Sequence, residues 1–92
     1  MVLSRVKYEL GLLGRHVKIL RLLGEKGPLG IVKLSKLTGV PSHQVRYSLR
    51  VLQQSGFLEP TTKGAMINSK AKRFIAELEN EKRKLAQTIA AI

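Results

Sequence analysis

One stretch of the chain, from Leu37 to Leu52, constrains the fold more than any other. It predicts the end of a short helix, a tight turn and the start of a second helix. Gly39 stands where a helix ends best on a left-handed residue, because glycine adopts positive φ without a Cβ clash. Val40 is then placed to fold back onto Leu34, the hydrophobic contact that accompanies such a cap. Pro41 cannot continue the first helix but suits the start of the next, where its missing N–H loses no hydrogen bond.

The second helix, expected over residues 42–55 with Ser42 as its N-cap, has one apolar and one polar face. The apolar residues Val45, Leu49 and Leu52 recur at spacings of 4 and 3. The other face carries the long hydrogen-bonding side chains of His43, Tyr47, Arg50 and Gln54, with Arg46 at its edge. This is the construction of a helix-turn-helix recognition helix, whose exposed side chains enter the major groove of DNA.

The charge of the chain indicates a partner that carries phosphates. The 92 residues include 17 Lys and Arg against 6 acidic residues, a net charge of +11. Between residues 31 and 76 there are eight basic residues and one acid, Glu59. A basic, solvated surface without a partner is the alternative. A small domain this basic nevertheless repels itself unless a polyanion neutralises it, so nucleic acid is the favoured partner.

Residues 1–26 predict a first helix with an N-terminal extension. Its apolar residues follow heptad-like spacings of 3 and 4 through Leu3, Val6, Leu10, Leu13, Val17 and Leu20. Ser4 is a candidate N-cap, and Gly11 and Gly14 are expected either to kink the helix or to admit a close neighbour. The next short helix places Lys33 and Lys36 away from its apolar side, where they can reach phosphates.

A hairpin follows the recognition helix, which Ser55-Gly56 ends. Residues 57–59 and 65–67 are short strand candidates, and the turn-forming stretch 60–64, with Thr62 and Lys63, closes the loop between them. A hairpin over 57–67 after a helix-turn-helix is a wing, and we expect it to contact the DNA backbone through Thr62 and Lys63. Residues 31–68 therefore form the helix-turn-helix with its wing.

Residues 69–92 predict a C-terminal dimerisation helix. Ser69 is expected to cap it, and Lys82 interrupts its apolar seam. The seam is made of Ala71, Ile75, Leu78, Leu85, Ile89 and Ile92, widened by Phe74. Together with the N-terminal seam, it is expected to lie outside the compact unit. One solution packs the two terminal helices of one chain on each other. The other, which we favour, pairs them with a second chain in a two-fold homodimer. The candidate interface is Leu3, Val6, Leu10, Leu13, Phe74, Ile75, Leu78, Leu85 and Ile89.

These residues resemble the winged helix-turn-helix superfamily, and within it the small archaeal predicted transcriptional regulators. The resemblance runs through four segments, residues 31–41, 45–52, 56–60 and 62–64. It implies sequence-specific or general DNA binding as a dimer. The length of 92 residues predicts one domain, which we interpret as a single winged-helix domain over residues 1–92. The implied groove residues are Ser42, His43, Gln44, Arg46, Tyr47 and Arg50.

Other roles for these side chains remain open. Arg46 and Arg50 suit guanine or phosphate, and the alternative is a solvated helix face. Tyr47 can touch a phosphate or a thymine methyl, or lie across its helix. His43 can read a base or cap the helix, and with His16 as the only other histidine it makes a poor metal ligand set.

Several function classes are disfavoured. The chain has no Cys and no Asp, so disulfides, thiolate metal sites and an acidic metal cluster for phosphodiester chemistry are missing, and we predict no enzyme, metal or cofactor. No window is apolar enough to span a membrane, and a cytoplasmic protein is expected. No small-molecule effector is evident. The function predicted is a dimeric DNA-binding transcriptional regulator. The alternatives are an architectural protein that coats DNA with little specificity and a winged-helix module that docks to protein.

Overall fold

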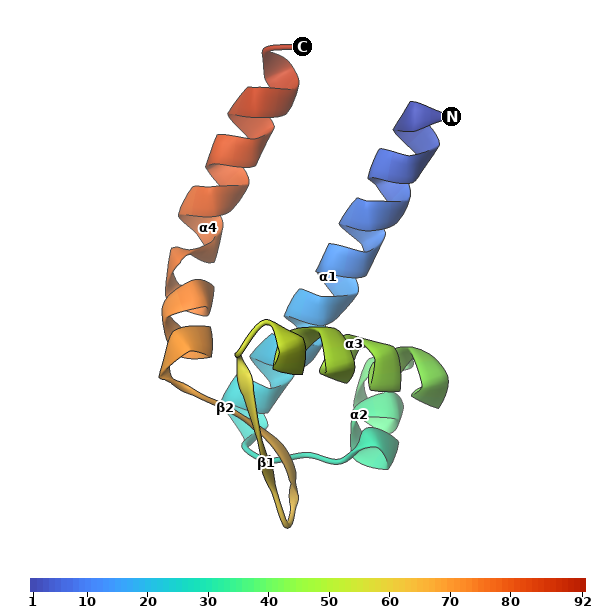
Figure 1. Cartoon of the computed structure of the whole chain (residues 1–92), viewed down its shortest axis with the longest axis vertical. Helices are drawn as coiled ribbons and strands as arrows, with labels where there is room; N and C mark the ends of the chain where they lie inside the picture. The colour runs from blue at the N-terminus through green and yellow to red at the C-terminus, as the bar shows by residue number, and fades with distance from the viewer.

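The computed structural model describes residues 1–92 and contains four helices and one hairpin (Figure 1). The elements are α1 (Val2–Lys26), α2 (Ile31–Thr38), α3 (Ser42–Gln54), β1 (Leu58–Thr61), β2 (Gly64–Ile67) and α4 (Ser69–Ala90). This order confirms the predicted mainly helical fold with a small β-hairpin. Helix α3 ends one residue before the predicted boundary.

The turn between α2 and α3 forms as the sequence predicts. Gly39 takes φ 73°, and its N–H donates to the carbonyl of Ser35 at 2.9 Å. Two side-chain bonds fasten the next residue, Val40: its carbonyl accepts from the Ser35 hydroxyl at 2.6 Å, and its N–H donates to Thr38 Oγ1 at 3.2 Å. These contacts fix the direction in which α3 leaves the turn.

All three predicted serine caps are wrong. Helix α1 begins at Val2 with Met1 before it, so Ser4 lies within the helix. Ser42 and Ser69 are the first helical residues, and the caps are Pro41 and Asn68. The Asn68 side chain accepts from the Ala71 N–H at 3.0 Å. Asparagine is as good an N-cap as serine, and Asn68, which directly precedes the helix in an extended conformation, therefore caps α4.

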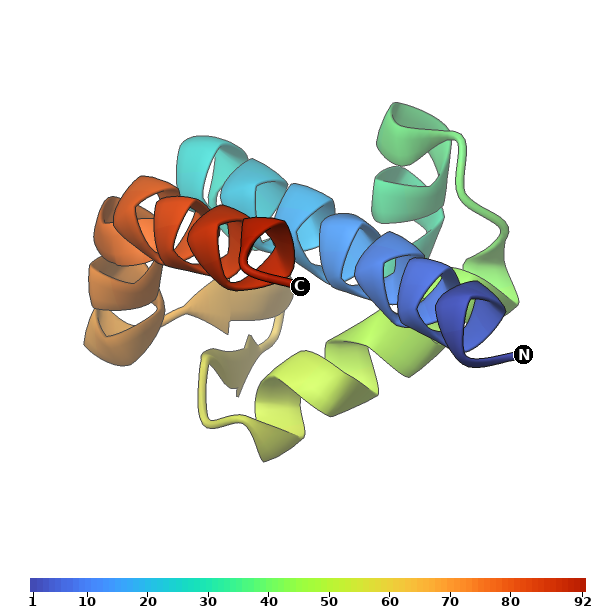
Figure 2. The ribbon, with the colours of Figure 1, turned by 90° about the horizontal axis from the view of Figure 1, so that it is seen from above.

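The core lies where the second half of α1 meets the other elements. Its buried residues are Ile19, Leu20, Leu23, Leu34, Val45, Leu52, Leu58, Ile67 and Ala71. Viewed along the long axis, α2, α3 and α4 are arranged around α1 (Figure 2). Helix α1 is therefore the central element of the fold, and the predicted apolar face of α3 packs on it.

The hairpin is short and closely tied to the α1–α2 connection. Thr61 pairs with Gly64, which leaves Thr62 and Lys63 as a two-residue turn. The strands thus extend further into the predicted loop than expected. Ala65 forms a bridge with Leu29, and a Cβ at Gly64 would lie 2.3 Å from the Leu29 carbonyl carbon. Gly64, at φ 121°, is required by this close approach of two backbones.

Both terminal helices extend beyond the core, and both chain ends lie at the same end of the molecule (Figure 1). Helix α1 runs uninterrupted through Gly11 and Gly14, and a Cβ at either glycine would meet nothing within 4 Å. The expected kink or close neighbour is therefore not observed. Phe74 and Ile75 pack against the core and Leu78 is buried, so this part of α4 belongs to the compact unit, contrary to the prediction.

Candidate nucleic-acid interface

Helix α3 presents the polar face that the sequence predicts. Its other face is anchored by Val45 and Ser48, both fully buried, and by Leu52. The candidate groove residues Ser42, His43, Arg46, Tyr47 and Arg50 are exposed, and Gln44 is half-buried at the edge of the face. The structure thus brings the six candidates together on one helix, with long donors directed outward.

The arginines on this face are free of carboxylate partners. The three ion pairs of the chain join Arg21 to Glu79, Lys82 to Glu79 and Lys84 to Glu81. All of their acidic members belong to α4. The hydrogen bond and charge of Lys82, with a smaller contribution from Arg21, lower the pKa of Glu79. None of these ion pairs involves a cation of α3, so the positive charge of Arg46 and Arg50 remains available to an anion.

A buried serine anchors α3 to α1, and the sequence analysis missed it. The hydroxyl of Ser48 accepts a 2.8 Å hydrogen bond from Arg15 Nε and lies 2.8 Å from Nδ1 of His16. Burial, and secondly the charge of Arg15, lower the pKa of His16. In the neutral tautomer that carries its proton on Nε2, His16 accepts at Nδ1, and the serine hydroxyl is then satisfied as both donor and acceptor.

The anchor extends to the exposed face of α3 through Tyr47. The Arg15 guanidinium carbon lies 5.8 Å from the Tyr47 ring centroid, within cation–π range. The His16 and Tyr47 ring centroids are 6.1 Å apart. Tyr47 therefore lies between α1 and the predicted groove face. One signal pointed to this arrangement: Ser48 interrupts the apolar stripe of α3, and a buried hydroxyl needs a partner.

The remaining candidate DNA residues lie on α2 and at the hairpin tip. Lys33 and Lys36 are exposed on α2, and Thr62 and Lys63 are exposed in the two-residue turn. Thr61 stiffens this tip, because its Oγ1 accepts from the Lys63 N–H at 3.1 Å and donates to the Gly64 carbonyl at 2.6 Å. The tip projects away from the terminal helices (Figure 1).

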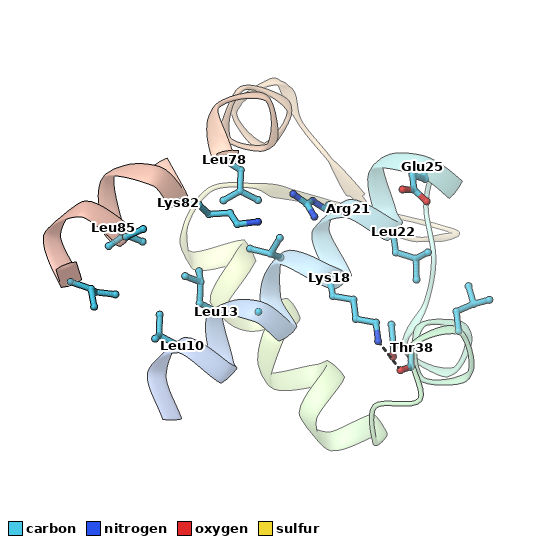
Figure 3. Close-up of a pocket in the computed structure, with 15 residues that line it drawn as sticks. Leu10, Leu13, Lys18, Arg21, Leu22, Glu25, Thr38, Leu78, Lys82 and Leu85 are labelled. Carbon is cyan, nitrogen blue, oxygen red and sulfur yellow. Dashed lines mark hydrogen bonds between the residues drawn. The ribbon is translucent and has the colours of Figure 1, made fainter. Parts of the chain in front are cut away.

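An apolar groove of about 690 Å³ separates α1 from α4 (Figure 3). Leu10 and Leu13 line it from α1, and Leu78 and Leu85 line it from α4. Of the predicted interface residues, the exposed ones are Leu3, Val6, Leu10, Leu13, Leu85 and Ile89, whereas Leu78 is buried and Phe74 and Ile75 are half-buried. Lys82, which interrupts the apolar seam of α4, donates to Glu79 of its own helix at 3.1 Å. None of the helices is long and apolar enough to cross a membrane.

The comparisons with known proteins identify a family. A model of the IclR helix-turn-helix domain matches residues 12–61, from α1 through the end of β1. No curated protein matches the chain. The match covers more than half of the sequence and includes the turn and recognition helix described above. It confirms the winged helix-turn-helix resemblance, while the narrower resemblance to archaeal regulators stays a prediction. The family is one of non-enzymatic DNA-binding regulators. The chain therefore belongs to the IclR-type helix-turn-helix family and is a DNA-binding transcriptional regulator.

Proposed function

We propose that this regulator binds DNA as a homodimer, with α3 of each chain in a major groove and each hairpin on the backbone. The observation that carries the binding mode is the outward face of α3. Arg46 and Arg50 are exposed there without any carboxylate within 4 Å, opposite the buried Val45 and Leu52. A guanidinium group free of protein partners can pair bidentately with N7 and O6 of guanine.

The hairpin and α2 would supply phosphate contacts on either side of the groove. The wing has a tip of only two residues, which suits contact with one strand of the backbone better than insertion into the minor groove. Lys63 at this tip and Lys33 and Lys36 on α2 are exposed cations. Phosphate contacts fix register and carry no sequence information, so specificity is assigned to α3.

The terminal helices support the homodimer. Leu10 and Leu13 on α1 and Leu85 and Ile89 on α4 are each at least 40% exposed. They line the groove between the two helices, and most of that groove's lining is apolar. The same two helices of a second chain could pack against these residues and bury their exposed apolar surface. That arrangement is isologous and closes on itself. It would present two recognition helices to half-sites about 34 Å apart or a multiple of that distance.

Binding assays with substituted proteins test the mode. Arg46→Ala and Arg50→Ala should each weaken binding to a duplex selected from a random pool. A lost base contact costs about 1–3 kcal/mol of discrimination, whereas a lost phosphate contact weakens all sequences alike. Arg83→Ala is the matched control, because Arg83 is an exposed cation of α4 without an ion pair. Equal binding by all three variants would remove α3 from the interface.

Two further readouts separate the alternative functions. A scrambled duplex should bind far more weakly than the selected one, and equal binding would instead favour an architectural protein. Affinity should also fall steeply with salt, since about 6–10 phosphate contacts imply a loss of roughly 10³–10⁵ between 50 and 200 mM. A flat response would favour a protein-docking module.

A further inference from the structure

A second cleft, of about 420 Å³, lies between the first half of α1 and the polar face of α3. Its α1 side includes Tyr8 and Arg15, and its α3 side includes Arg46, Tyr47 and Arg50. No acidic residue lines it. We call it the α1–α3 cleft. Three guanidinium groups and two phenol rings thus border one space in which nothing neutralises the positive charge.

Arg15 is held in a fixed position at this cleft. Its Nε donates to the fully buried Ser48 hydroxyl at 2.8 Å, and its guanidinium carbon lies 5.8 Å from the Tyr47 ring centroid. Its two Nη groups make no hydrogen bond within the protein, so four N–H donors remain. A guanidinium that is already ordered loses little conformational entropy when it binds an anion, so it is suited to hold one.

We propose that the α1–α3 cleft binds a backbone phosphate of the DNA, with Arg15 as its anchor and the Tyr8 hydroxyl as a further donor. This inference rests on the proposed function, because the cleft shares Arg46 and Arg50 with the face of α3 that enters the groove. That continuity assigns the phosphate to DNA rather than to a free anion. Helix α1, to which sequence analysis gave no DNA contact, becomes part of the interface.

Arg15→Gln tests the anchor with little structural change. The glutamine Nε2 occupies the same place along the side chain as the arginine Nε, so the donor to Ser48 is kept while the charge and both Nη groups are lost. The slope of log affinity against log salt should become shallower by about one for each cleft engaged, equally on selected and scrambled duplexes. The melting temperature should stay near that of wild type.

Arg83→Gln is the matched control, because it removes one charge from α4, which contributes no residue to the cleft. If Arg15→Gln shows the same affinity and salt slope as this control, Arg15 only positions Ser48 and the proposal fails. If the wild-type protein binds no duplex, the proposed function and this inference fail together. If Arg50→Ala weakens binding while Arg15→Gln matches the control, the inference alone fails.

The two tyrosines provide a direct probe of the cleft. Tyr8 and Tyr47 are the only tyrosines of the chain, and both line it. Protein labelled with 3-fluorotyrosine should give two fluorine resonances, and both should shift when a duplex is added. Arg15→Gln should reduce the Tyr8 shift. A Tyr8 resonance that stays in place on saturation with DNA would contradict the proposal. Inorganic phosphate, added at constant ionic strength, should move neither resonance. A clear shift would assign the cleft to a free anion and overturn the assignment to the backbone.

Discussion

The Ser48 anchor leads to a prediction about stability that can be worked out from its hydrogen bonds. Ser48→Ala removes one bond from a charged donor, Arg15, and one to the neutral ring of His16. Bonds of these kinds contribute about 1.5–3 and 0.5–1.5 kcal/mol. Arg15 and His16 are half-buried, so water can replace part of what each loses. We therefore take the lower limit for each hydrogen bond, so that Ser48→Ala should lower the free energy of unfolding by about 2 kcal/mol.

Thermal unfolding followed by circular dichroism measures this loss. In a domain of this size each kcal/mol shifts the melting temperature by about 4–8 °C, so Ser48→Ala should melt roughly 8–16 °C lower. Ser42→Ala is the control on the same helix, because Ser42 is exposed and its side chain makes no hydrogen bond. It should stay within about 0.5 kcal/mol of wild type. All samples need the same protein concentration, since dimerisation makes the melting temperature concentration-dependent.

Equal melting of Ser48→Ala and Ser42→Ala would refute this reasoning. The hydrogen bonds of Ser48 would then be replaced by water at no net cost. Arg15 would then not be fixed in advance at the α1–α3 cleft by its bond to Ser48.

Three further predictions concern assembly, pH and the hairpin. Leu85→Glu and Ile89→Glu place charges on exposed positions of the groove, so light scattering should show folded monomers. Leu78→Glu should instead unfold the chain, because Leu78 is buried. If both groove variants remain dimers, the proposed interface is wrong. The pKa of His16 is lowered in the folded chain, so the unfolded chain binds the proton more readily. The stability that depends on neutral His16 should be fully present above about pH 6.5 and should be lost as the pH falls through the pKa of the folded chain. Melting curves from pH 7.5 to 5 should therefore show a smaller fall in melting temperature for His16→Gln than for wild type. Gly64→Ala should destabilise the domain by more than 1 kcal/mol, since its Cβ would collide with the Leu29 backbone. If the variant unfolds in urea at the same concentration as wild type, the two backbones do not approach this closely.

Local chemistry made the helix-turn-helix predictable. Gly39 and Pro41 act within a few residues of themselves, so the turn follows from the sequence alone. The spacing of Val45, Leu49 and Leu52 likewise fixes which side of α3 is buried. The caps were misplaced by one residue at α3 and α4, because Pro41 and Asn68 stand directly before the serines and adopt the non-helical backbone that a cap requires.

The spacing of apolar residues in the sequence did not predict which elements pack against each other. Periodicity shows that Leu78 and Leu85 share one side of α4, but it does not say what covers each of them. The chain itself buries Leu78, whereas Leu85 stays 47% exposed because α1 and α4 are separated by the groove there. The contact between Arg15 and Ser48 joins residues 33 positions apart, and no local rule pairs them.

Backbone amide shifts, followed by NMR as a duplex is added, show whether the outward face of α3 binds DNA. We expect the largest shifts in residues 42–54, at the hairpin tip around Lys63 and near Arg15 in α1. The second half of α4, beyond Lys82, should change little. Shifts concentrated along the groove between α1 and α4, with α3 unaffected, would contradict DNA binding by this face.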